Sequence, residues 1–155
     1  MCFFFYRLSV NSDIKTRDPI AGTWRLVSFE EQRADGTPVY PMGREVKGYI
    51  SYDGRGHMSV QLMRTDLRKF TSNDPLAATS EEKIAAFEGY LAYWGTYTVN
   101  EEEGSVTHYL EGSLVPNWVN TVRKRFFQVS EDRLILTFPM TGDTVSSRLI
   151  WERWK

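Results

Sequence analysis

The chain has 155 residues, the size of one domain, and its 19 basic and 20 acidic side chains leave a formal charge of -1. This balance lacks the basic excess that draws proteins to phosphate backbones, so we expect no nucleic-acid partner. The single cysteine, Cys2, excludes an intrachain disulfide. Such cysteine usage is typical of a reducing compartment, so the sequence predicts a cytoplasmic protein.

The opening residues, MCFFFYRLSV, contain an apolar run that is shorter than the roughly 7–15 residues of a signal peptide's hydrophobic region. No stretch reaches the roughly 18 apolar residues that a membrane-spanning helix needs. We therefore expect residues 1–19 to form a poorly ordered tail without a signal or membrane role. Residues 20–155 are expected to form the single domain.

From Trp24 onward, short runs rich in β-branched and aromatic residues are separated by turn signals such as ADG, DGRG, EEEG and TGD. The predicted strands are TWRLVSFEEQR, KGYISYD, GHMSVQLMR, GTYTVNE, SVTHYLEGS, TVRKRFFQVS, DRLILTF and SSRLIWERW. About eight antiparallel strands can close into a barrel whose interior holds side chains or one small ligand. Two packed sheets are the alternative.

One segment, ATSEEKIAAFEGYLAYWG, breaks the strand pattern. Thr79 followed three residues later by Glu82 predicts a capping box at a helix start. An apolar stripe at spacings of three and four follows, formed by Ile84, Phe87, Leu91 and Trp94. The sequence thus predicts an amphipathic helix that ends at Gly95 and caps or flanks the barrel. A face that binds a partner is the alternative.

The segment AGTWRLVSFE resembles the Gly-x-Trp opening of lipocalins and other calycins. The segments GYISYDGRGHMSVQLMR, FEGYLAYWGTYTV, VTHYLEGSLVPNW and LIWERW extend the likeness over residues 20–154. Together they are similar to the bacterial and fungal lipocalin-like domain family. The resemblance implies an all-β fold, an antiparallel lipocalin-like β-barrel with a small-molecule cavity. Members of the family include carriers as well as cofactor-independent isomerases and cyclases.

The same resemblance implies how the barrel is closed. In calycins a basic side chain of the last strand stacks on the tryptophan of the first strand. The matching residues are Gly22 and Trp24 in the first strand, with Arg153 or Arg148 as the basic side chain. A guanidinium plane can lie on an indole face and still donate hydrogen bonds to loop carbonyls.

The strand SVTHYLEGS carries the candidate for acid–base chemistry. Alternation puts Val106, His108 and Leu110 on one face, and Glu111 on the other unless Gly112 marks a bulge. An imidazole in an apolar cavity stays neutral and can exchange a proton near pH 7. His108 is therefore the candidate general acid or base. A histidine that is only held by a neighbouring hydroxyl or carbonyl is the alternative.

The loop and strand that follow supply further candidate contacts. Asn117 and Trp118 lie in a loop expected at the barrel mouth. In TVRKRFFQV both alternating faces carry charge, so either face can be interior. If Arg125 points inward, its guanidinium can hold a carboxylate, phenolate or enolate oxygen; a solvated face is the alternative. The remaining predicted ligand-binding residues are Tyr93, Trp94, Tyr49 and Gln61.

Several kinds of site lack sequence support. His57 and His108 have no carboxylate helpers at metal-ligand spacing, and no glycine-rich phosphate loop, dinucleotide fingerprint or nucleophile elbow occurs. We therefore expect no metal and no cofactor.

The sequence predicts a barrel that binds a small apolar or aromatic molecule. It either isomerises or cyclises that molecule by proton transfer at His108, with Arg125 or Asn117 steadying an oxyanion, or carries it unchanged. A protein-interaction module is a third alternative. The sequence leaves the choice between a monomer and a homodimer open.

Overall fold

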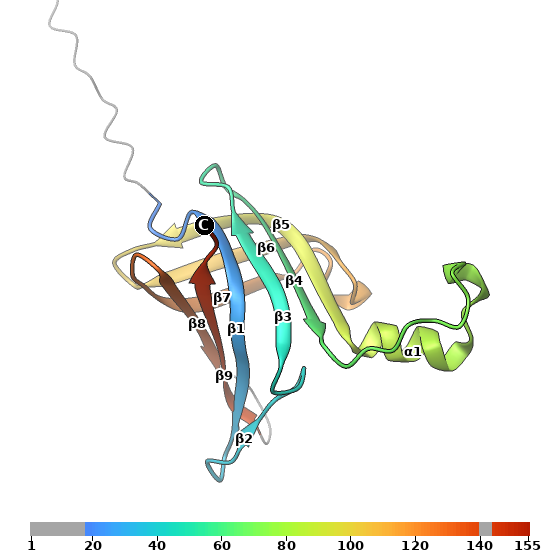
Figure 1. The fold of residues 1–155 in the computed structure, drawn as a ribbon. Helices are drawn as coiled ribbons and strands as arrows, with labels where there is room; N and C mark the ends of the chain where they lie inside the picture. Colours follow the sequence, from blue (N-terminus) through green and yellow to red (C-terminus); the bar gives the residue numbers. More distant parts are fainter. Residues whose placement is uncertain (1–17, 140–143) are drawn as a thin grey trace, which may run out of the picture.

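The computed structural model describes residues 18–139 and 144–155, so the prediction for residues 1–17 of the tail lies outside it (Figure 1). Its strands are β1 (Gly22–Arg33), β2 (Pro38–Val39), β3 (Val46–Tyr52), β4 (His57–Arg64), β5 (Tyr90–Asn100), β6 (Ser105–Ser113), β7 (Val122–Val129), β8 (Arg133–Pro139) and β9 (Thr144–Arg153). The helical elements are the 3₁₀ turn η1 (Pro75–Ala77), the helix α1 (Ser80–Glu88) and the 3₁₀ turn η2 (Pro116–Trp118).

The strands form a closed antiparallel barrel. They pair in the order β1-β3-β4-β5-β6-β7-β8-β9, and β9 pairs back onto β1, while the short β2 adds to the far end of β1. Closure leaves no sheet edge along the barrel wall for another chain to pair with. The prediction of a lipocalin-like barrel is confirmed, and the alternative of two packed sheets is wrong.

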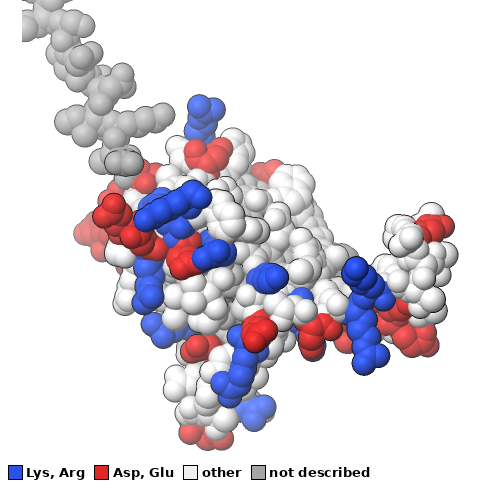
Figure 2. Space-filling view, in the orientation of Figure 1, with Lys and Arg blue, Asp and Glu red and all other residues white. Residues whose placement is uncertain are grey.

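Alternation along each strand builds the core. In β4, Met58, Val60 and Leu62 are buried, whereas Gln61 and Met63 are exposed. Because successive strand residues point to opposite faces, one set fills the interior and the other meets solvent. On the face shown in Figure 2, acidic and basic side chains are interspersed over the outer surface.

One end of the barrel is closed by an arginine on a tryptophan. The Arg153 guanidinium carbon lies 4.0 Å from the ring centre of Trp24, whose side chain is completely buried. Arg153 also donates from Nη1 to the carbonyl of Ala21 at 3.0 Å and from Nε to that of Glu131 at 2.7 Å. Trp24 Nε1 donates to the carbonyl of Ile20 at 2.8 Å. Stacking and hydrogen bonds therefore join the two ends of the domain.

Of the two basic residues that the resemblance allowed, Arg153 occupies the stacking position, whereas Arg148 lies exposed on β9. Gly22 makes room for this arrangement. Its φ is +130°, and a Cβ there would lie 2.6 Å from Arg153 Nη1. A larger residue at position 22 would strain the backbone and displace the guanidinium.

We expect the Arg153→Met variant to lose about 1–3 kcal/mol of unfolding free energy, because it lacks the cation–π contact and leaves two carbonyls without a donor. The matched variant Arg148→Met should change the unfolding free energy by less than about 0.5 kcal/mol. Urea denaturation of both variants measures the difference. Equal losses would show that the stacked position has no special role.

The helix is shorter than predicted. The capping box of Thr79 and Glu82 is present, but α1 ends at Glu88 and β5 begins at Tyr90. The predicted end at Gly95 is therefore wrong, and the second half of the stripe, Leu91 and Trp94, belongs to a strand.

The first half of the stripe is exposed, with 56% of Ile84 and 52% of Phe87 accessible to solvent. The helix projects from the barrel beside the start of β5 and does not plug its interior (Figure 1).

Candidate ligand-binding site

A small apolar cavity lies inside the barrel, towards the end that carries η2. Its volume is about 50 Å³, and its lining is aliphatic and aromatic except for one charged side chain, that of Arg125. Its lining includes Tyr93, Trp118, Arg125, Leu136 and Phe138. A space of this size holds one or two water molecules, since a water occupies about 30 Å³ of the liquid.

The alternating exposure of side chains along β7 shows on which face Arg125 lies. Along this strand Arg123, Arg125 and Phe127 alternate with more exposed neighbours such as Phe126, which is 41% accessible. Arg125 lines the cavity and stacks on Phe138, with 3.7 Å between the guanidinium carbon and the ring centre. The face of β7 that carries Arg125, which the sequence left unassigned, is thus the interior face.

Arg125 brings a charge into the apolar interior without a counter-ion. Its Nη1 donates to the carbonyl of Lys124 at 3.0 Å, and no acidic side chain pairs with it among residues 18–139 and 144–155. Burial lowers the pKa of Arg125 from its usual value. Because that value lies above about 12, the guanidinium stays charged at neutral pH.

Two aromatic residues predicted from the sequence meet at this cavity. Tyr93 is buried, and its ring contacts that of Trp118 edge-on, with 6.1 Å between the centres. Trp118 is half-buried, and the guanidinium of Arg123 lies 4.5 Å over its ring. The neighbouring Asn117 is exposed and does not line the cavity. Of the loop pair, only the tryptophan therefore contributes to this cavity.

His108 is completely buried, on the face that alternation assigned to it. Its Nε2 lies 2.8 Å from the hydroxyl of Tyr52, and its Nδ1 has no hydrogen-bond partner within the described part of the chain. Burial, and next the positive charge of Arg125, lower the pKa of His108 to about 3. The imidazole is therefore neutral at physiological pH. His108 is not among the residues that line the cavity.

The tyrosine that holds His108 belongs to a wider aromatic cluster. The ring of Tyr52 packs against Tyr97, with 4.8 Å between centres, and the hydroxyl of Tyr97 donates to the carboxylate of Asp18. Burial raises the pKa of both tyrosines, so they remain neutral phenols. These partners could not be predicted from a local pattern, because they come from separate strands and from the residues that precede β1.

Glu111 stays on the outside. The register between β5 and β6 shifts where Gly95 faces Leu110 and Trp94 faces Gly112, which leaves Glu111 as the extra residue of a bulge. Its side chain is exposed. A His108–Glu111 dyad does not form.

Three other predicted ligand contacts lie on the outer wall. Tyr49 is 41% accessible, Trp94 is 54% accessible, and Gln61 is also exposed. They are separated from the interior cavity by the barrel wall. Phe138 was not predicted as a cavity residue, although Leu134, Leu136 and Phe138 alternate along β8 as an interior face would.

No group of three metal-ligating side chains occurs in the part of the chain that the structure describes. Within the same residues, none of the helices has the length and apolar character needed to cross a bilayer.

The sequence model of the lipocalin-like domain family matches residues 21–154. The chain belongs to this family. A relative of this lipocalin-like protein in Aspergillus oryzae is the 4'-hydroxy-3'-methoxypropiophenone carrier protein ppsC. The two sequences are 31% identical over 106 residues, which cover 62% of this chain and 96% of the relative. Family and relative together support small-molecule binding.

Proposed function

We propose that this lipocalin-like protein binds a small oxygenated aromatic molecule inside its barrel and carries it unchanged. The observation that supports this most is the uncompensated guanidinium of Arg125 in an apolar, aromatic-lined cavity. A buried cation without a counter-ion is costly, and a ligand oxygen that accepts its hydrogen bonds relieves that cost. The relative's name describes the carriage of a hydroxylated aromatic ketone, which is a molecule of this class.

The residues around Arg125 suit such a ligand. An aromatic ring would contact Tyr93 and Trp118, and its carbonyl or phenolic oxygen would accept from the Arg125 guanidinium. Small-molecule sites typically have a largely apolar lining with a few polar groups that fix orientation. The cavity wall, with one arginine among aliphatic and aromatic side chains, has this composition.

Binding requires the cavity to enlarge, because about 50 Å³ is far below the roughly 300 Å³ of a small-molecule pocket. Trp118 is the side chain best placed to move. It is half-buried, it belongs to a short 3₁₀ turn, and its indole is held by an edge contact with Tyr93 and by Arg123. Rotamer changes at a binding site are common when a ligand arrives. We infer that the ligand ring takes over the indole's contacts.

Carriage is favoured over isomerisation or cyclisation by the surroundings of His108. This residue does not line the cavity, its Nε2 is engaged by Tyr52, and its low pKa makes it a weak base at neutral pH. General acid–base catalysis requires a group within hydrogen-bond reach of the reacting proton. Recovery of the ligand after incubation tests this choice, since chromatography with mass spectrometry should return it unchanged. Conversion by the wild type but not by His108→Gln would establish catalysis instead.

We expect Arg125→Met to weaken the binding of 4'-hydroxy-3'-methoxypropiophenone at least about tenfold, because the variant loses a charge-assisted hydrogen bond inside the barrel. Isothermal titration calorimetry measures the dissociation constant. The matched control is Arg148→Met, which removes an exposed arginine of β9 that does not line the cavity. Equal affinities of Arg125→Met and the wild type would exclude Arg125 as the anchor.

A further inference from the structure

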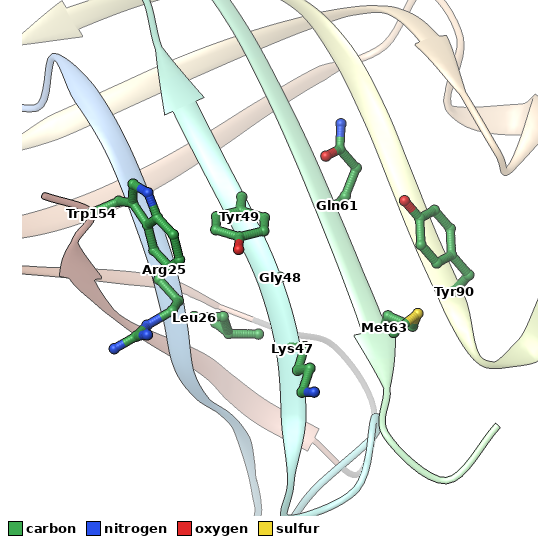
Figure 3. Close-up of a pocket in the computed structure, with 9 residues that line it drawn as sticks. All are labelled: Arg25, Leu26, Lys47, Gly48, Tyr49, Gln61, Met63, Tyr90 and Trp154. Carbon is green, nitrogen blue, oxygen red and sulfur yellow. The ribbon is translucent and has the colours of Figure 1, made fainter.

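The outer wall of the barrel carries a groove that is separate from the interior cavity. It has a volume of about 480 Å³ and crosses β1, β3, β4 and the first residue of β5 (Figure 3). This volume lies within the roughly 300–1,000 Å³ of small-molecule sites. The groove is therefore large enough for a small molecule without rearrangement of the core.

Three aromatic rings border the groove. Tyr49 and Trp154 meet edge to face with 5.2 Å between ring centres, and Tyr90 lies on the far side, beyond Gln61 (Figure 3). The exposed fractions of Tyr49, Trp154 and Tyr90 are 41%, 48% and 37%. Large aromatic side chains grouped on an outer surface mark sites of contact with other molecules. Aromatic faces and edges of this kind favour a second flat ring.

The charged groups of the groove are all positive. Arg25 and Lys47 line it, and none of the acidic side chains that the structure describes does. Arg25 is engaged, since it pairs with Glu152 and its guanidinium carbon lies 5.2 Å from the ring centre of Trp154. Lys47 is exposed, and it makes no ion pair within residues 18–139 and 144–155. Its ammonium is therefore available to an anion.

We propose that this groove is a second ligand site, which binds a flat aromatic molecule that carries an acid group. The ring packs against Tyr49 and Trp154, and the acid group pairs with Lys47, while the amide of Gln61 offers both a donor and an acceptor. The concave shape and the unpaired ammonium of Lys47 favour this occupant over a second copy of the chain, which would need a complementary acidic surface. The site is independent of ligand binding inside the barrel.

The test uses two fluorescent probes of similar shape, the anion anilinonaphthalenesulfonate and the neutral phenylnaphthylamine. We expect the anion to bind the wild-type protein, and Lys47→Glu to weaken it about tenfold because attraction becomes repulsion. Trp154→Ala should weaken it about fivefold through loss of the ring contact. The matched control Lys69→Glu makes the same charge change at an exposed position outside the groove and should leave the affinity unchanged.

Further outcomes distinguish the groove from the barrel and from self-association. Arg125→Met should leave binding of the anionic probe unchanged; weakening by Arg125→Met without weakening by Lys47→Glu would overturn the proposal in favour of the interior. Equal affinity for the neutral probe, or equal effects of Lys47→Glu and Lys69→Glu, would overturn the requirement for an acid group. If Trp154→Ala converted a dimer to a monomer in size-exclusion chromatography and left probe binding intact, the groove would be a contact between copies, which also overturns the proposal.

Discussion

Trp24→Ala is expected to lower the free energy of unfolding by about 3–5 kcal/mol, the range for truncating a buried tryptophan. The indole is completely buried, its Nε1 donates to the carbonyl of Ile20, and its face supports the guanidinium of Arg153. Alanine would leave a cavity in the core, an unpaired buried carbonyl and an arginine without its platform. These losses occur where the first strand meets the last, so they weaken the closure of the barrel as a whole.

Chemical denaturation followed by circular dichroism measures this loss. The matched control is Trp154→Ala, which truncates the same side chain at a position that is 48% exposed, and should change the unfolding free energy by less than about 1 kcal/mol. Trp24→Phe keeps an aromatic face under Arg153 and loses only the hydrogen bond and part of the volume. Its loss of unfolding free energy should lie between those of Trp24→Ala and Trp154→Ala. Similar losses at Trp24 and Trp154 would contradict the assigned role.

The fold could be predicted from the sequence because barrel closure imposes a simple pattern. Each strand buries one face, so apolar residues recur at every second position, as in Met58, Val60 and Leu62. The predicted end of the helix was wrong for a related physical reason. Leu91 and Trp94 fit the three- and four-residue spacing of a helix, but Leu91 and Tyr93 also fit the two-residue spacing of a strand. Pairing of this segment with β4 and β6 decided between them, and a local pattern does not contain that information.

The candidate site was predictable only in part. Alternation within β6 was enough to assign His108 to the interior, because its neighbours on that face are aliphatic. The face of Arg125 could not be assigned, since charged residues alternate on both sides of β7 and burial of a guanidinium runs against the usual preference for solvent. Tyr49 lies on the outer wall, and the aromatic character that suggested a pocket does not specify a side. Which residues meet across the barrel depends on strand register.

Lowering the pH from 7.5 to 5 is expected to reduce the unfolding free energy by about 2 kcal/mol through His108 alone. The pKa of His108 is about 3 in the folded protein, whereas an unfolded histidine has a pKa of about 6.5. Below pH 6.5 the unfolded chain therefore binds a proton that the folded protein excludes. Its stability falls by about 1.4 kcal/mol per pH unit until the pH approaches the folded-state pKa. The stability that depends on a neutral His108 is therefore complete above about pH 6.5 and is lost progressively as the pH falls towards 3.

The groups around His108 do not titrate in this window. Burial raises the pKa of Tyr52 and Tyr93, and Arg125 stays charged. Surface carboxylates with lowered pKa values, such as Asp53 at about 2, lose their contribution only below about pH 4. Thermal or urea unfolding of His108→Gln, which keeps a hydrogen-bonding group near Tyr52 but cannot titrate, should show a flat profile between pH 7.5 and 5. His57→Gln, which removes the exposed histidine paired with Asp53, should retain the decline of the wild type. A decline that persists in His108→Gln and disappears in His57→Gln would assign the effect to the surface, and the burial of a neutral His108 would then not govern acid stability.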